Sequence, residues 1–305
     1  MPIKRITTTF LAMTVLVLVS LAAPAIATAT TLERIKESGR IRFGYFAEAQ
    51  PFTSKAADGT VEGYGAVLCQ RIAEQVKGEL SLPDLKLDWV PVTKTDALPD
   101  IEQGSVDVLC TPLSVTLTRR QRVSYSLPVF PGGARAVVRA DAPLALRQAL
   151  SDTPSTKPVW RGSPAAKTLG ETSVAVVAGG TTEAWLGGRI ASFHIGANVV
   201  PVPDYKTGVQ QLRDGKVQIF FGDRAAALGA MDPSTRNDFT VLDRLFTREQ
   251  YALAVPRGDE DFRLLVDRAL NALFASGDIE SLYAKSFGAP DDGIRAFFKW
   301  NTLIQ

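Results

Sequence analysis

The sequence of 305 residues contains a single histidine, His194, and two cysteines, Cys69 and Cys110. These counts exclude zinc sites built from several cysteines and histidines, and they exclude CxxC redox motifs. A nucleophile with a histidine base would have one imidazole available, and we interpret His194 as a structural residue between a loop and a strand. The phosphate-binding pattern GxxxxGK[ST] is also missing. We therefore expect neither a metal ion nor a cofactor.

The chain has no strong excess of either charge, since its formal net charge is +2 at pH 7. Such a protein lacks the electrostatic field that attracts nucleic acid or an anionic membrane, so we expect neither as a partner. Hydrophobic residues make up 46% of the chain and charged residues 22%, which is typical of a globular core rather than of disorder.

The longest apolar run lies at the N-terminus, where Phe10 to Ala23 follows the basic residues Lys4 and Arg5. It precedes Ala25-Ile26-Ala27, a small-residue cleavage pattern, so residues 1–27 are predicted to be a secretory signal peptide. The alternative is an uncleaved membrane anchor, but the run is short for a bilayer span of about 20 residues. We expect a mature protein in the periplasm.

Strands and helices alternate in two series along the mature chain, which predicts an α/β fold with parallel strands. A capping box at Thr30 to Glu33 opens the first helix. The second series begins near Ala134, and its last strand, 251–256, is expected to cross back. The expected strands are 41–46, 85–90, 106–110, 173–178, 217–221 and 251–256, and the main helices are 64–76, 98–103 and those starting at 183, 224 and 259.

Residues 109–130, LCTPLSVTLTRRQRVSYSLPVF, carry the most informative pattern. Ser114, Thr116 and Thr118 alternate at the end of a strand, Arg119 follows, and an aromatic-Ser-x-Pro segment comes next. The pattern resembles the signature of periplasmic amino-acid-binding proteins of polar amino acid ABC transporters, which are bacterial solute-binding proteins of family 3. By itself, Arg119 among Arg120 and other basic residues would indicate a solvated helix face.

The resemblance covers nearly the whole mature chain and implies a two-lobed periplasmic-binding-protein fold of type II. Lobe 1 would comprise residues 28–130 and 252–305, and lobe 2 residues 134–246. Two hinge strands, near 130–133 and 247–251, would join them. The Pro-, Ser- and Thr-rich stretch 142–169 is interpreted as a surface elaboration of lobe 2.

The resemblance also implies a clamp for the two charges of an amino acid. The Arg119 guanidinium would grip the α-carboxylate with two parallel hydrogen bonds. Thr181 and Thr182 would bind the same carboxylate at a helix start. Asp223 would bind the ammonium, since a buried ammonium needs a charged partner; its alternative role is a helix N-cap, and both roles are compatible.

The resemblance implies five further ligand contacts, near the strand that ends at Ser114 and in the segment 46–64. They are the hydroxyls of Ser114 and Thr116, the carbonyl of Pro112, the ring of Tyr64 and the ring of Phe46. The alternative for Tyr64 is a core aromatic at a helix start. Pro112, Gly65, Val67 and Gln218 depart from residues usual in the family, so the side-chain pocket is expected to be unusual.

Phe46 stands where relatives place a charged or polar residue that reads the ligand side chain. Because an apolar ring offers no counter-charge, we expect an amino acid whose side chain is uncharged. Glu48 and Gln50 lie on the same loop and are the counter-argument, since they offer acceptors for a cationic or polar group.

The function implied is capture of an amino acid and its delivery to the permease of an ABC transporter in the inner membrane, by a monomer without enzymatic turnover. Two alternatives use the same fold: an exported dehydratase of cyclohexadienyl acids, and a sensor that presents its ligand to a membrane receptor. Cys69 and Cys110 are expected to form a disulfide, because the compartment is oxidising and their number is even. The alternative is two buried thiols.

Overall fold

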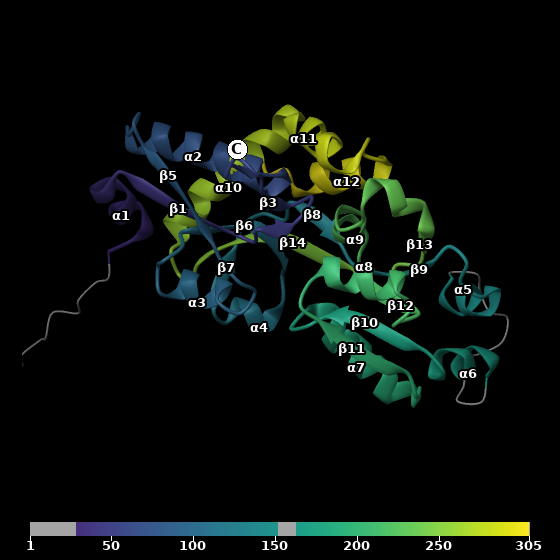
Figure 1. The fold of residues 1–305 in the computed structure, drawn as a ribbon. Coiled ribbons are helices and arrows are strands. Elements are labelled where there is room, and N and C mark those ends of the chain that lie inside the picture. Colours follow the sequence, from purple (N-terminus) through teal and green to yellow (C-terminus); the bar gives the residue numbers. More distant parts are fainter. Residues whose placement is uncertain (1–28, 152–162, 305) are drawn as a thin grey trace, which may run out of the picture.

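The computed structural model describes residues 29–151 and 163–304. The predicted signal peptide, residues 1–27, lies outside the described residues. The described chain forms two α/β lobes, each built around one larger sheet (Figure 1). Among these residues, none of the helices has the length and apolar character needed to cross a membrane.

Lobe 1 contains the larger of the two main sheets and a small separate sheet. Its strands are β1 (Arg40–Tyr45), β2 (Glu48–Ala49), β3 (Thr53–Lys55), β4 (Val61–Glu62), β5 (Lys86–Pro91), β6 (Val108–Ser114), β7 (Val123–Tyr125), β8 (Phe130–Gly132) and β14 (Glu249–Pro256). The main sheet has the order β5-β1-β6-β14-β7, with β8 paired to β14. β1 runs parallel to β5 and β6, as predicted, and β14 crosses back antiparallel to β6. The small sheet β2-β3-β4 was not predicted.

The lobe 1 helices are α1 (Thr31–Ser38), α2 (Tyr64–Leu80), α3 (Ala97–Glu102), α4 (Leu117–Arg120), α10 (Glu260–Ser276), α11 (Asp278–Phe287) and α12 (Asp292–Asn301). α2 buries Leu68, Ile72 and Val76, which recur every four residues and therefore lie on one face. α10 packs beside α2 (Figure 1). Asp259 is the N-cap of α10, and its side chain accepts a hydrogen bond from the Phe262 amide. These elements confirm the helical spacing and the cap read from the sequence.

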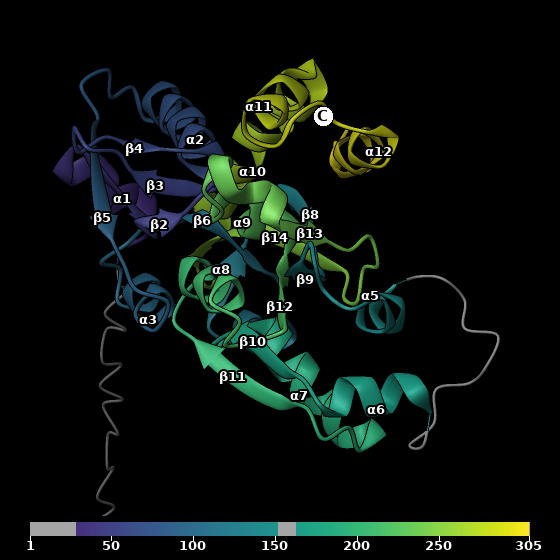
Figure 2. The ribbon, with the colours of Figure 1, turned by 45° about the vertical axis from the view of Figure 1, so that its right-hand side comes forward.

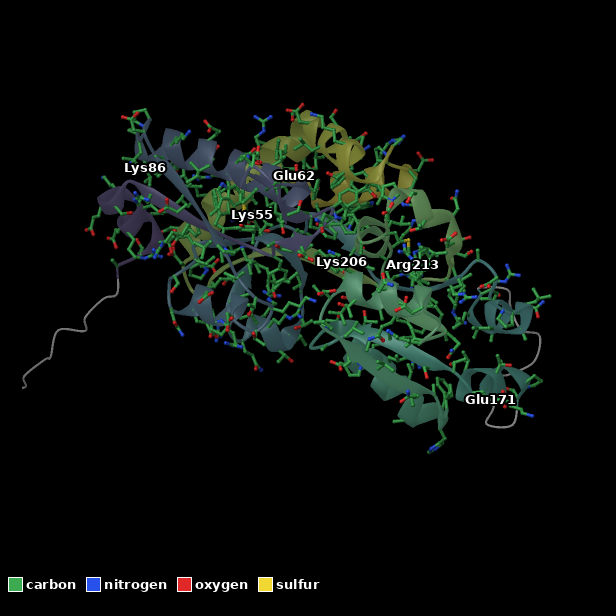
Figure 3. The ribbon with its side chains drawn as sticks, in the orientation of Figure 1. Lys55, Glu62, Lys86, Glu171, Lys206 and Arg213 are labelled. Carbon is green, nitrogen blue, oxygen red and sulfur yellow. A yellow bond between two sulfur atoms is a disulfide. The ribbon has the colours of Figure 1, made fainter. Side chains whose placement is uncertain are left out.

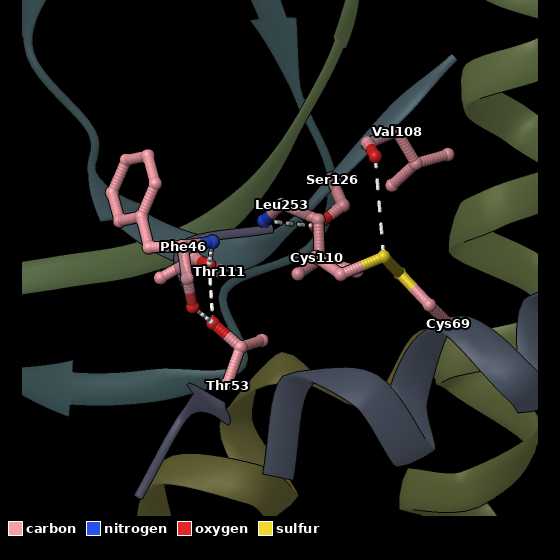
Figure 4. The surroundings of a disulfide bond; sticks show 8 residues. All are labelled: Phe46, Thr53, Cys69, Val108, Cys110, Thr111, Ser126 and Leu253. Carbon is pink, nitrogen blue, oxygen red and sulfur yellow. Dashed lines mark hydrogen bonds between the residues drawn. A yellow bond between two sulfur atoms is a disulfide. The ribbon is translucent and has the colours of Figure 1, made fainter. Parts of the chain in front are cut away.

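A disulfide joins Cys69 on α2 to Cys110 on β6, with the two Cα atoms 5.9 Å apart (Figure 4). This confirms the predicted pairing. Gly65 lies one turn earlier on α2, and a Cβ added there would come within 1.9 Å of the Cys110 carbonyl oxygen. The start of α2 thus packs directly on β6, and this close contact requires a glycine at position 65.

Lobe 2 is built on the second main sheet, which has five strands in the order β11-β10-β12-β9-β13. Its strands are β9 (Ala134–Arg139), β10 (Ser173–Val177), β11 (Asn198–Val202), β12 (Ile219–Asp223) and β13 (Phe239–Val241), and its helices are α5 (Leu144–Leu150), α6 (Pro164–Gly170), α7 (Thr181–Phe193), α8 (Tyr205–Arg213), α9 (Arg224–Gly229) and the 3-10 helix η1 (Pro233–Asp238). β10 runs parallel to β11 and β12, whereas β9 runs antiparallel to β12.

The structure bears on two predictions for lobe 2, the role of His194 and the nature of the Pro-, Ser- and Thr-rich stretch. His194 ends α7 in the left-handed conformation, with φ of 52°, in keeping with a structural role. Within the stretch interpreted as a surface elaboration, the described residues form α5 and most of α6, which lie at the far end of lobe 2 (Figure 2). Leu146 and Leu150 of α5 are buried in the lobe 2 core, so this helix also stabilises the lobe.

The chain passes between the two main sheets twice, from β8 to β9 and from β13 to β14. The two passages lie side by side, since Phe130 pairs with Tyr251 and Gly132 with Glu249. Gly133 has φ of 153°, and an added Cβ would lie 2.0 Å from the Thr247 carbonyl oxygen. A glycine is therefore required where the first passage touches the second.

Candidate ligand-binding cleft

A cavity of about 1060 Å³ lies between the two lobes and is hereafter called the cleft. Lobe 1 contributes the ends of β1 and β6 and the loop around Gln50, and lobe 2 contributes the start of α7 and α9. Of the nine predicted ligand-binding residues, seven line the cleft: Phe46, Pro112, Ser114, Arg119, Thr181, Thr182 and Asp223. Tyr64 and Thr116 do not.

Arg119 reaches the cleft from α4, directly after the buried strand β6. Its side chain is half-buried, and Nη1 donates a hydrogen bond to the Ser114 carbonyl oxygen at 2.9 Å. That bond orients the guanidinium and leaves further donors for a carboxylate, because the group carries five N–H donors in a planar fork. The position in the cleft argues against Arg119 being merely part of a solvated helix face.

Thr116 caps the helix that carries Arg119. Its Oγ1 accepts a hydrogen bond from the Arg119 amide at 3.1 Å and caps α4. The hydroxyl is used to start the helix that carries Arg119, so the residue positions the arginine and does not line the cleft.

Tyr64 lies in the core of lobe 1 and does not line the cleft. It is 1% exposed, its hydroxyl donates to the Val129 carbonyl oxygen at 2.8 Å, and its ring packs edge-on against Phe287 at 5.2 Å. Burial raises the pKa of its phenol well above the usual value. Tyr64 is a core aromatic at the start of α2, the alternative that the sequence left open.

Phe46 lies at the C-terminal end of β1 and half-buries its ring against the lobe 1 core. Its backbone is fixed by two buried threonines: the Phe46 amide donates to Thr111 Oγ1 at 2.9 Å, and Thr53 Oγ1 donates to the Phe46 carbonyl oxygen at 2.9 Å (Figure 4). Phe46 thus lines the cleft with an apolar ring, on a backbone that two threonine side chains hold in place.

The start of α7 faces the cleft from lobe 2. Gly180 precedes the helix without a side-chain cap, so amides of its first turn, Thr182 among them, have no intrahelical partner. Thr181 lies at the meeting point of the lobes: its Oγ1 is 3.4 Å from Ser114 Oγ and donates to Glu249 Oε2 at 2.7 Å. This is the geometry of a helix start that can accept an anionic group.

Asp223 ends β12 and is buried at the inner end of the cleft. Its Oδ1 accepts from the amides of Ala225 and Ala226, which makes it the N-cap of α9, and Oδ2 accepts from the Gly133 amide at 3.3 Å. Burial raises the pKa of this carboxyl to about 6, although the three amides oppose the shift. The N-cap role is confirmed, and a cation in the cleft would further stabilise the charged form.

Several charged residues of the cleft were missed by the sequence analysis. Lys94 Nζ donates to the Pro203 carbonyl oxygen across the lobes at 2.8 Å, and burial lowers its pKa while nearby Asp204 opposes the shift. Lys206 Nζ lies 3.9 Å from Glu48 on the other lobe. Figure 3 shows Lys206 on lobe 2 and Lys55 on lobe 1, and both line the cleft. Single lysines carry no motif, so only the fold reveals that these three line the cleft.

Comparison with known proteins shows to which protein family this chain belongs. Residues 41–289 match the bacterial extracellular solute-binding proteins, family 3. The chain belongs to this family. Among curated relatives, an L-glutamate/L-aspartate-binding protein of Pseudomonas aeruginosa is 29% identical over 281 residues, covering 91% of this chain and 87% of that protein.

Solved structures share the fold at lower identity. A cysteine-binding protein from Campylobacter jejuni matches with a TM-score of 0.67 and 18% identity, over 87% of this chain and 96% of that one. An ancestral amino acid-binding protein, described as a precursor of cyclohexadienyl dehydratase, matches with a TM-score of 0.66 and 22% identity, over 85% of this chain and 100% of that one. These likenesses confirm the two-lobed fold of this family.

Proposed function

We propose that this solute-binding protein captures an amino acid in the cleft and delivers it to the permease of an ABC transporter. One observation carries the proposal: Arg119, the start of α7 and Asp223 face a single cavity between the lobes. A guanidinium fork and free helix amides suit the α-carboxylate, and a buried carboxylate suits the ammonium. The names of the relatives, which bind amino acids, support this reading.

The passages at 130–133 and 247–251 are proposed as the hinges about which the lobes close. Three contacts across the lobes, at Lys94, Lys206 and Thr181, support closure around a ligand. Residues 28–130 and 252–305 would then move against residues 134–246. We further propose that the mature protein acts as a monomer in the periplasm after removal of residues 1–27.

A thermal-shift screen against the L-amino acids tests the proposal. A ligand present at 100 times its Kd should stabilise the fold by about 2.7 kcal/mol. Analogues of the best ligand that lack either the carboxylate or the amine should give little stabilisation, because each removes the partner of a buried charge. Equal stabilisation by the three compounds would contradict a clamp that reads both charges.

The charges of the cleft are balanced, which bears on the ligand side chain. Among the described residues, the cleft is lined by four basic side chains and four acidic ones: Lys55, Lys94, Arg119 and Lys206, and Glu48, Asp204, Asp223 and Asp232. Lys206 faces Glu48, and Asp204 lies near Lys94. Since Phe46 adds an apolar wall, we propose a ligand with an uncharged side chain.

The expected result of a competition assay is that neutral amino acids displace the bound ligand more strongly than charged ones do. An unpaired charge beside Phe46 would be costly to bury. The assay compares all twenty L-amino acids at equal concentration against a labelled neutral ligand. Glutamate, aspartate, arginine or lysine outcompeting every neutral amino acid would show that the Phe46 argument fails. The ligand named for the Pseudomonas relative makes this a demanding test.

Affinity is expected to fall as the pH drops below about 6, because Asp223 has its pKa raised to about 6 by burial and must be charged to bind the ammonium. Ligand binding lowers that pKa, so binding near pH 6 should release protons, and affinity should decline by up to about tenfold per pH unit below it. The stability of the fold depends on pH in the opposite direction. Because the pKa of Asp223 is higher in the folded protein than its ordinary value of 3.8, its contribution to stability is fully present below pH 3.8 and is lost as the pH rises through 6.

Calorimetry at pH 7.5, 6 and 5, in buffers of different ionisation enthalpy, measures both the affinity and the proton release. Asp223→Asn is the matched variant, and any binding that it retains should be nearly independent of pH over this range. Constant wild-type affinity from pH 7.5 to 5, or proton uptake on binding, would contradict the role of Asp223.

We also propose that the protein has no turnover. The ancestral neighbour described as a precursor of a dehydratase makes the alternative worth testing. A dehydratase needs a general acid aimed at a leaving group; Glu48, the conceivable candidate, is exposed and faces Lys206. Incubation of the mature protein with prephenate or arogenate should give no aromatic product above background. Product formation that Glu48→Gln abolishes would establish an enzyme instead.

A further inference from the structure

A second cavity, of about 1370 Å³, lies where the two passages meet the C-terminal helices, and we call it the α12 cavity. Its walls come from residues 130–133 and 247–250, from α9 in lobe 2, and from α11 and α12 in lobe 1. It adjoins the cleft at Ser114, Thr181, Asp223 and Gly229 but is not lined by Arg119 or Phe46. The two cavities therefore share part of their lining, but the Arg119 guanidinium lines the cleft alone.

One wall of this cavity lies beyond the part of the chain that matches the family. The match ends at residue 289, and α12 spans Asp292–Asn301. α12 is firmly docked on lobe 1: Phe298 is 2% exposed and packs on Phe274 at 5.8 Å, and the Asn271 side chain exchanges hydrogen bonds of 2.7 and 3.1 Å with the Leu303 backbone. Figure 2 shows α12 beside α11 at the edge of the molecule.

The side of α12 that lines the cavity is apolar. Ile294 and Phe297 line it from α12, and Phe287 lines it from α11. Trp185 and Leu228 face the cavity from lobe 2. An apolar ligand body can therefore contact both lobes at once.

Four arginines also line the cavity: Arg135, Arg224, Arg236 and Arg248. Within residues 29–151 and 163–304, none of the four arginines forms an ion pair with a carboxylate. The side chains of Arg224 and Arg248 are exposed and make no hydrogen bond to these residues. Arg135 and Arg236 donate to the carbonyl oxygens of Asp243 and Leu228. The guanidiniums thus keep most of their donors free.

The acidic side chains of the cavity are, by contrast, mostly engaged by the protein. Asp223 accepts from three backbone amides, and Glu249 accepts from the hydroxyls of Thr181 and Thr247 at 2.7 and 2.8 Å. Asp291 caps α12 by accepting from the Ile294 amide at 2.9 Å. An incoming molecule therefore meets free donors beside apolar rings, with few free acceptors.

We infer that the α12 cavity is a second binding site, for an organic anion that joins a carboxylate or phosphate group to an apolar body. The anionic group pairs with Arg224 and Arg248, whose planar forks match carboxylate and phosphate oxygens. The apolar body packs on Ile294 and Phe297. The site does not depend on which amino acid the cleft binds.

Isothermal titration of the mature protein with octanoate and with phenyl phosphate tests the site. At least one probe should bind, and the double variant Arg224→Gln/Arg248→Gln should weaken that binding by about tenfold or more. The matched control Arg71→Gln/Arg189→Gln removes two exposed arginines that line neither cavity, and should bind within about twofold of wild type.

Two further readouts keep the result separate from the cleft. Arg119→Ala should bind the probe as wild type does, and the melting temperature of each variant checks its fold. The inference is overturned if neither probe binds, if the Arg224/Arg248 variant binds as well as wild type, or if Arg119→Ala abolishes probe binding.

Discussion

Replacing Arg119 by alanine is expected to weaken amino-acid binding by about 3–5 kcal/mol, because the ligand carboxylate would be left in the closed cleft without its charged partner. This corresponds to a loss of roughly two to four orders of magnitude in Kd. Arg119→Lys should show an intermediate loss, since a lysine retains the charge but not the planar fork. Calorimetric titration with the best ligand from the thermal-shift screen measures all three proteins.

Arg120→Ala is the matched control, because Arg120 is the next residue of α4 and is exposed. It should bind within about twofold of wild type. Arg119→Ala should also retain the unliganded melting temperature to within a few degrees, which separates lost binding from lost folding. Near-native affinity of Arg119→Ala would rule out the clamp, whatever the ligand proves to be.

Removal of the disulfide is expected to lower the free energy of unfolding by about 4 kcal/mol in the chain-entropy account, since the bond closes a loop across a sequence separation of 41. Both cysteines are fully buried between α2 and β6, so Cys69→Ala/Cys110→Ala also loses some packing. Urea unfolding of the unliganded variant and wild type measures the difference.

Neither cysteine lines the cleft, so the folded variant should retain its affinity at low temperature. Wild type unfolded in the presence of a reductant should show a similar loss of stability, which serves as the control. A difference below about 1 kcal/mol would mean that the bond adds little to the packing of α2 on the sheet.

The sequence predicted those parts of the fold that local patterns determine. The spacing of Leu68, Ile72 and Val76 defined the buried face of α2, and the position of Asp223 between an apolar strand and a helix indicated its cap. The motif around Arg119 placed the arginine at the end of a buried strand, where the structure puts it in the cleft.

The sequence says least about residues whose position depends on contacts distant in the chain. Tyr64 became a core residue because Tyr283 and Phe287, more than 200 positions later, pack against its ring. Lys94 enters the cleft because lobe 2 brings Pro203 beside it. Neither partner is visible from the local sequence.

We propose that one cleft binds both the carboxylate and the ammonium of an amino acid, and a crystal structure of the mature protein with its ligand would show both contacts. The ligand carboxylate should lie within hydrogen-bonding distance of the Arg119 guanidinium and the Thr182 amide, with the ammonium at Asp223 and the side chain beside Phe46. A ligand bound between the lobes without contact to Arg119 and Asp223 would contradict this proposal.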